Sequence, residues 1–378
     1  MKEKTNIEIK GEKQKLYSSR QITQIIDLIS EKHYKNEIIV EISNKKNIKN
    51  IIILDESIKM NQKYIGLVED NFVIDSKSLL SIYHKGKPYS ASIDLNIILM
   101  RECFIIFHQI FQHYQDNGHK MNMDDKETLL YELYQLLLNV NEEKFNSRFE
   151  KYFESHTSFD KKKVKRLKEN LNKQLDLYNK FEIYNSTKVN NDFKEENYKD
   201  VIRLEKQFIY HFNRLSKPML YVQFENDQWK MLGVKMIKEE YFEHSNPQFL
   251  DINMIKQTSP LLISLAVSTP FIPIMIKLSH ALYQSKVKDN QYKTNLTKLD
   301  DVIESNEIQL IQPDLTLNEI DEMEKKVNKK IDELPESLKS KIKEGQSAII
   351  NTSITSLREN KIYFENIEIN NKDSISDN

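Results

Sequence analysis

The chain has 378 residues, and its 56 lysines and arginines nearly balance its 57 aspartates and glutamates, so no global charge attracts it to nucleic acid or to a membrane. Its six glycines are spread so widely that neither G-x-G-x-x-G nor G-x-x-x-x-G-K-[ST] occurs, which disfavours the phosphate-cradling loops of many nucleotide enzymes. A single cysteine, Cys103, excludes an internal disulfide and a cysteine-rich zinc site. With a charged N-terminus that lacks the apolar stretch of a signal peptide, we expect a cytoplasmic protein.

The N-terminal third predicts a small α+β domain. Residues 1–17 are polar, and we expect them to be loose. A short amphipathic helix is predicted at Ile22–Ile29, where isoleucines recur at spacings of three and four. Four β-branched or turn-flanked segments follow and predict an antiparallel meander: Glu37–Ile42, Ile51–Leu54, Tyr64–Ile74 and Ser81–Ile93.

Leu95 to Phe111 is apolar around most of its circumference, so we expect a helix buried on all sides. The next helix is predicted to begin at Asp124, because Glu127 completes a capping box. Residues 161–184 carry apolar residues close to a heptad spacing, which fits a coiled coil or a packed helical hairpin equally. Another helix is predicted from Tyr198 to Phe212.

The C-terminal half begins with the clearest β-hairpin pattern, near 219–237. Leu261–Ile276 is an uncharged run of 16 residues that contains two prolines. It is too short to span a bilayer, so we expect a buried helix pair with a proline break, with membrane association as the alternative. A capping box at Thr316 and Glu319 predicts a further helix that ends at Pro335.

These patterns together predict an α+β fold that is mainly α-helical. A small N-terminal antiparallel sheet packs on a buried helix, followed by helical hairpins, one β-hairpin and a helical C-terminal region. The predicted organisation has six parts: a loose N-terminus at 1–17, an α+β domain at 18–120, a helical domain with the hairpin at 121–284, a linker at 285–314, a helical region with a closing strand at 315–369, and a tail at 370–378.

Arg101 and His108, on the apolar helix, have six residues between them. This spacing resembles the R-x(4–6)-H signature of HEPN ribonucleases, and the resemblance covers eight residues, with Glu102 in place of the usual Asn, Asp or His. It implies RNA cleavage by the arginine and histidine across a helical dimer. The structural alternative is a buried Arg101 paired with a carboxylate such as Asp94, and it is the reading we favour.

A basic run follows further along, formed by Lys161, Lys162, Lys163, Lys165 and Arg166. On a helix with tyrosines nearby, such a run could follow a nucleic-acid backbone. A solvated helix surface is the plainer explanation, and basic runs usually have it.

Two weaker patterns concern metal ions. His108, His113 and His119 lie near one another, but spacings of five and six do not place ligands on one helical face. Asp314 followed by Glu324 and Lys326 matches a PD…(D/E)xK nuclease string, but the last two fall within a capped helix where a strand is needed. We predict neither a metal nor a cofactor.

The leading hypothesis is therefore an intracellular, non-catalytic interaction or regulatory protein, with a protein partner or self-association through amphipathic helices. The alternatives are a nucleic-acid-binding or RNA-cleaving protein and, third, a protein that associates with membranes through Leu261–Ile276. No Ser-His-Asp arrangement is recognisable from residue order alone.

Overall fold

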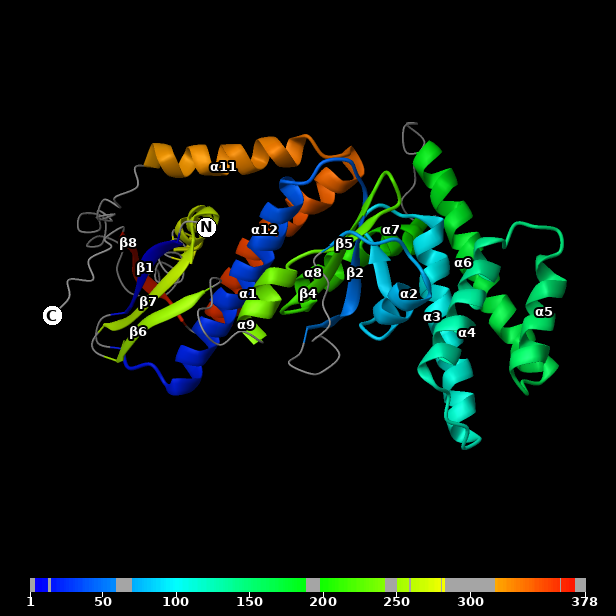
Figure 1. The fold of residues 1–378 in the computed structure, drawn as a ribbon. Coiled ribbons are helices and arrows are strands. Elements are labelled where there is room, and N and C mark those ends of the chain that lie inside the picture. Colours follow the sequence, from blue (N-terminus) through cyan, green and yellow to red (C-terminus); the bar gives the residue numbers. More distant parts are fainter. Residues whose placement is uncertain are drawn as a thin grey trace, which may run out of the picture. The chain divides into compact units, whose positions relative to one another are not determined.

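The computed structural model describes residues 4–12, 15–58, 70–187, 198–241, 250–257, 260–279, 281–282, 317–360 and 362–370. The chain forms two compact units: unit 1 comprises Met1–Lys46 and Gly233–Asn378, and unit 2 comprises Asn47–Leu232. Each unit has a four-stranded antiparallel sheet and several helices, which confirms the predicted mainly α-helical α+β class (Figure 1). This division differs from the boundaries drawn at 120 and 284 from sequence, because unit 2 is inserted into unit 1.

Unit 1 is built from both ends of the chain. Its described elements are β1 (Lys4–Gly11), α1 (Ser19–Ser43), α9 (Val234–Tyr241), β6 (Asp251–Gln257), β7 (Leu261–Ser268), the 3-10 helix η3 (Thr269–Phe271), α11 (Leu317–Asp332), α12 (Glu336–Glu359) and β8 (Phe364–Asn370).

The sheet of unit 1 has the strand order β6-β7-β1-β8, so β1 is an inner strand. Ile7 and Ile9 lie opposite Leu265 and Ile263 of β7, and all four are at most 1% exposed. The expectation of a loose N-terminus was therefore wrong. The two isoleucines at a spacing of two bury one face of β1, and pairing on both sides satisfies its backbone.

Helix α1 is the longest element of the N-terminal part. Ser18 and Gln21 form a capping box at its start. The helix contains the predicted segment Ile22–Ile29, but the strand predicted at Glu37–Ile42 is wrong, since those residues continue the same helix. Its residues from Tyr34 to Val40 are at most 8% exposed, so burial on all sides overrides the β preference of the branched side chains.

The uncharged run that begins at Leu261 divides into two structures. Its first part is β7, paired with β1 and β6, and its second part is helical from Thr269 onward. The predicted helix pair was thus wrong in its first half. Among the described residues, no helix has both the length and the apolar character needed to span a bilayer.

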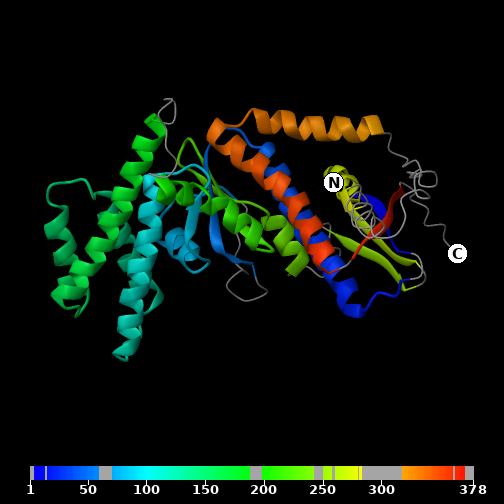
Figure 2. The same ribbon diagram turned by 180° about the vertical axis from the view of Figure 1, so that it is seen from behind.

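The C-terminal helices follow the prediction. Pro335 separates α11 from α12, and β8 closes the sheet against β1. α12 runs beside α1 in both views (Figures 1 and 2). Thr316 and the linker predicted at 285–314 lie outside the described residues.

Unit 2 is the inserted part. Its described elements are β2 (Ile48–Ser57), α2 (Ser76–Tyr83), β3 (Pro88–Ser90), α3 (Leu95–Asp116), α4 (Met123–Leu138), α5 (Phe145–His156), α6 (Lys161–Thr187), α7 (Lys199–Glu205), α8 (Gln207–Arg214), β4 (Pro218–Phe224) and β5 (Trp229–Met231).

The sheet of unit 2 has the order β3-β2-β4-β5. The predicted hairpin is confirmed as β4 and β5, although its last residues, from Val234, begin α9. Ile51–Leu54 is confirmed within β2, where all four residues are 0% exposed. Ser81–Tyr83 is helical rather than a strand, because Asp75 and Ser78 cap α2 ahead of it. Most of the hairpin predicted at Tyr64–Ile74 lies outside the described residues.

The long apolar helix is confirmed as α3, capped by Asp94. The next helix, α4, is capped by Asn122 rather than by Asp124. α6 packs against α3 and α7 inside unit 2. The helix predicted from Tyr198 to Phe212 is interrupted at Lys206, which ends α7 and begins α8.

Candidate functional site

Arg101 lies on the buried side of α3 and is 7% exposed. Its guanidinium donates hydrogen bonds to Oε1 of Gln174 at 3.1 Å and of Gln207 at 3.3 Å, and its Nε lies 3.7 Å from the carboxylate of Glu102. Burial raises the pKa of Glu102, and the charge of Arg101 offsets part of that rise. The expected pairing of Arg101 with Asp94 is not found. Asp94 instead accepts hydrogen bonds from backbone amides at the start of α3. Arg101 thus joins α3 to α6 and α8.

His108 is exposed, and its Nδ1 lies 3.2 Å from the hydroxyl oxygen of Tyr83. Tyr83 packs edge-on against Phe104 and Phe107, and burial raises its pKa to about 12. Arg101 and His108 therefore have separate partners, one set buried and the other at the surface. The structure does not bring them together around a common cleft within its described residues.

A second group in unit 2 is assembled from distant parts of the sequence. The ring of His211 stacks on that of Tyr89, with centroids 4.2 Å apart, and Arg214 Nη2 lies 3.4 Å from His211 Nδ1. Burial, assisted by the charge of Arg214, lowers the pKa of His211. The cavity beside Tyr89 holds about 10 Å³, which suits no ligand larger than one water molecule. Spacing along the chain gave no signal for this group.

The basic run occupies the first turns of α6, behind Asp160, whose carboxylate accepts the amide of Lys163. Lys163 Nζ lies 3.6 Å from the ring centroid of Phe159, and Lys165 is 4.0 Å from the carboxylate of Glu169. The other three cations are exposed, and the described residues offer them no acidic partner: Lys161, Lys162 and Arg166.

The histidines near the end of α3 have individual partners. His113 Nε2 lies 2.6 Å from the hydroxyl of Ser158, and His119 packs against the ring of Tyr114. The described residues contain no group of three or more His, Cys, Asp or Glu side chains that could hold a metal ion. Cys103 is buried, and burial raises the pKa of its thiol well above the usual range.

The nuclease string is not assembled within the described residues. Glu324 and Lys326 are on helix α11, and Glu324 accepts a hydrogen bond from Lys277. Asp314 lies outside the described residues. Glu41, within the segment predicted as the strand Glu37–Ile42, is on helix α1 and accepts the amide of Gly233 at 2.9 Å.

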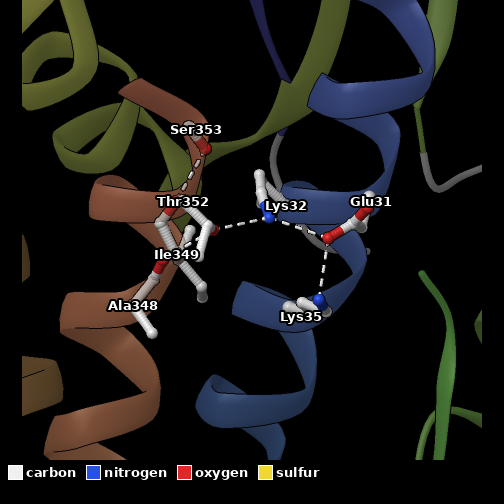
Figure 3. A network of polar contacts seen from close by, with 7 residues as sticks. All are labelled: Glu31, Lys32, Lys35, Ala348, Ile349, Thr352 and Ser353. Carbon is white, nitrogen blue, oxygen red and sulfur yellow. Dashed lines mark hydrogen bonds and ion pairs between the residues drawn. The ribbon is translucent and has the colours of Figure 1, made fainter. Parts of the chain in front are cut away.

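The buried polar side of α1 carries a network of charged side chains in unit 1 (Figure 3). Oε1 of Glu31 accepts hydrogen bonds from Nζ of Lys32 and Nζ of Lys35, each at 2.7 Å. Lys32 also donates to Thr352 of α12 at 2.9 Å. Burial lowers the pKa of Lys35 to about 8, against the opposing charge of Glu31. One carboxylate therefore serves two lysines that are at most 4% exposed.

One turn further, α1 contacts the end of β7 through three buried side chains. The Ser268 hydroxyl donates a hydrogen bond to Oε1 of Glu37 at 2.5 Å, and its oxygen lies 2.9 Å from Nε2 of His33. The Ser268 amide donates to the same Nε2 at 3.0 Å. In a hydrolase triad the serine hydroxyl faces the histidine and the acid holds the other ring nitrogen. Here the serine hydroxyl also lies beside the histidine, but it donates its hydrogen bond to the carboxylate of Glu37, and Ser268 is 4% exposed. The contact therefore fastens β7 to α1.

Comparisons of the chain with protein-family models, with curated proteins and with solved structures found no match.

Proposed function

We propose that the chain is an intracellular, non-catalytic interaction protein that self-associates through β6. The observation that carries this proposal is an apolar surface on a strand at the end of the sheet. Within the described residues, only β7 pairs with β6. Ile252, Met254 and Ile255 of β6 are 40–45% exposed.

The register places two of these residues on the core side of the sheet. Ile252 lies opposite Leu265 and Ile255 lies opposite Ile263. Directly opposed residues share a sheet face, and Leu265 and Ile263 are fully buried. The apolar face of the sheet thus continues onto β6, where it is partly uncovered. Such an edge is a template for pairing with another strand.

A bulge gives β6 a symmetric pattern that suits a second copy. The register shifts between Ile252 and Met254, so Asn253 is the extra residue, and its side chain bonds Asn6 across the opposite face. Within residues 251–256, Ile252 and Ile255 therefore face the core side of the sheet, and the other four residues face the opposite side. This pattern of faces is the same whether the strand is followed from 251 to 256 or from 256 to 251.

Two antiparallel β6 strands can therefore pair without any apolar residue changing face. Ile252 of each copy would lie opposite Ile255 of the other, and Asp251 opposite Lys256. Opposite charges in direct cross-strand contact favour this register over its neighbours. Because two seven-residue strands bury little area, we expect a weak dimer.

Analytical ultracentrifugation over a concentration series tests the proposal. We expect the wild type to form a dimer, and the double variant Ile252→Lys with Ile255→Lys to sediment as a monomer, because lysines block edge pairing. The matched control, Leu16→Lys with Val73→Lys, changes two other exposed apolar residues and should still dimerise. A wild type that stays monomeric, or a β6 variant that still dimerises, contradicts the proposal.

Charge reversal tests the register itself. Asp251→Lys alone and Lys256→Asp alone should each weaken the dimer by placing like charges opposite each other. The two changes together should restore it, since the pair is then reversed but intact. If the double variant dimerises no more tightly than the single ones, the two chains pair in another register or through another surface.

A second candidate function, nucleic-acid binding, is supported by the exposed cations at the start of α6. Replacing all five with Gln should remove most binding of a labelled oligouridine, and the wild-type affinity should fall steeply with salt. Lys325→Gln with Lys326→Gln, on the exposed side of α11, is the control. Binding without a salt slope, or unchanged by the five substitutions, rejects this function.

A further inference from the structure

A cavity of about 130 Å³ lies within unit 1, among α1, α11, α12 and the helical residues after β7. Its lining is mixed, and the apolar part includes Ile274, Met323, Val327 and Ile350 from three of these elements. A wholly apolar cavity of roughly 150 Å³ binds benzene, which gives the scale for this volume. The space therefore suits a molecule of about one six-membered ring.

One buried polar group of a residue that lines this cavity lacks a hydrogen bond. Asn36 of α1 lines the cavity and is 3% exposed. Its Nδ2 has no hydrogen-bond partner among the described residues. A buried amide without a partner costs about 1–3 kcal/mol, so native proteins seldom keep one without a ligand, water or other function to satisfy it. The missing partner is an acceptor, because Nδ2 is a donor.

The charges at the cavity cancel. Lys277 and Glu324 both line it, and they form an ion pair with each other. The remaining polar lining comes from Gln346 and Ser347, which are neutral, and Ser347 is exposed. A charged ligand would therefore find no unmatched opposite charge in the lining, whereas a neutral one need not disturb the pair.

We propose that this cavity binds a neutral small molecule of about one ring, held by apolar contact and by an oxygen atom that accepts a hydrogen bond from Asn36. The inference rests on the cavity and on Asn36, and it is independent of self-association through β6. Because three helices wall the site, the bound molecule joins α11 to α1 and α12 and stabilises unit 1 by mass action.

Phenol and toluene are matched probes, because they have the same number of heavy atoms and only phenol carries an oxygen. Each is titrated into the full-length chain while methyl resonances of Ile274, Met323 and Ile350 are followed by NMR. We expect saturable shifts at these methyl groups with phenol. Asn36→Leu keeps the side-chain size and removes the donor; since the donor is unpaired, the variant should fold at least as stably as the wild type.

The decisive quantity is the ratio of the toluene to the phenol dissociation constant. It should fall about tenfold from wild type to Asn36→Leu, the size of one hydrogen bond to a neutral group. Asn351→Leu, at an exposed position of α12, is the matched control and should leave the ratio unchanged. An unchanged ratio in Asn36→Leu overturns the proposed role of Asn36. Absence of saturable shifts with phenol overturns the site, and leaves Asn36 to a bound water molecule.

Discussion

The two long helices α1 and α3 are both buried, but they are buried in different ways. α3 of unit 2 is apolar on nearly every side, and its buried charges, Arg101 and Glu102, are adjacent in sequence and contact each other. α1 of unit 1 buries Lys32, Lys35 and Glu37 within two turns, and contacts α12 and β7 through them. Both units thus have polar contacts between segments that are far apart in sequence, since Arg101 also bonds Gln174 and Gln207, but α1 buries more charged side chains than α3 does.

The largest effect should come from the apolar helix. Phe107 is 1% exposed and packs against Tyr83 with ring centroids 5.0 Å apart. Phe107→Ala should lower the free energy of unfolding of unit 2 by about 3–5 kcal/mol, because it leaves a cavity. Urea unfolding followed by fluorescence measures this, since the single tryptophan, Trp229, belongs to unit 2 and is buried. Phe111→Ala, at a partly exposed position of the same helix, should cost clearly less; equal losses would mean that packing does not govern α3.

A somewhat smaller effect is expected when Glu31 loses its charge. Glu31→Gln leaves two buried ammonium groups without their shared carboxylate, and breaking a buried pair costs about 3–5 kcal/mol. We expect about 3 kcal/mol, because Glu31 itself keeps 22% of its side chain exposed. Hydrogen exchange of the α1 amides measures the loss in unit 1.

The control for this change is a surface pair of unit 2. Glu142 lies 2.6 Å from Arg148, and both side chains are about half exposed. Glu142→Gln should cost about 0–1 kcal/mol. If the two glutamates cost the same, the polar contacts of α1 are not what distinguishes unit 1.

The pH dependence of unit 1 follows from Lys35. Its pKa is 10.5 when unfolded and about 8 when folded, so between these values the unfolded chain binds more protons. Stability should therefore rise as pH increases through 8, at up to about 1.4 kcal/mol per pH unit. Lys35→Met should abolish this rise. Hydrogen exchange of the α1 amides between pH 7.5 and 9.5, a range that includes the folded pKa, measures it after correction for intrinsic exchange rates. A rise that persists in the variant would have to come from another group.

The smallest expected effect concerns unit 2 at acid pH. The pKa of His211 is lowered from 6.5 by burial and by Arg214. Below pH 6.5 the unfolded imidazole takes up a proton that the folded one resists, so the stability of unit 2 should fall as pH falls. His211→Gln should flatten this fall in Trp229-detected unfolding, and an identical profile in the variant would exclude His211 as its source.

How far the sequence predicts these two helices depends on whether their buried side chains are apolar or polar. A stretch of apolar residues as long as α3 predicts a buried helix, so the position and the burial of α3 could be predicted from the sequence. In α1 the polar residues from Lys32 to Glu37 have the composition of a surface loop. Their burial depends on Glu31, Thr352 and Ser268, and spacing along the chain cannot reveal partners so distant.

The strands of unit 1 show the same limit. Ile7 and Ile9 are the only apolar signal of β1 between Lys4 and Gly11, and two residues are too few to establish a period. An apolar run as short as β7 cannot be distinguished from a helix by periodicity alone. Pairing with β1 and β6 makes this run a strand. The cavity beside Asn36 was also beyond prediction, because four separate elements form it.

The insertion of unit 2 into unit 1 has a consequence for synthesis on the ribosome. Every partner of β1 in the sheet is translated after the whole of unit 2, and the contact from Thr5 to Thr269 spans 264 positions. Since domains generally fold as units during translation, we expect unit 2 to fold first, while β1 and α1 wait. During that interval Lys32 and Lys35 remain in water. The nascent chain thus keeps its N-terminal segment soluble with the same ammonium groups that the finished protein buries.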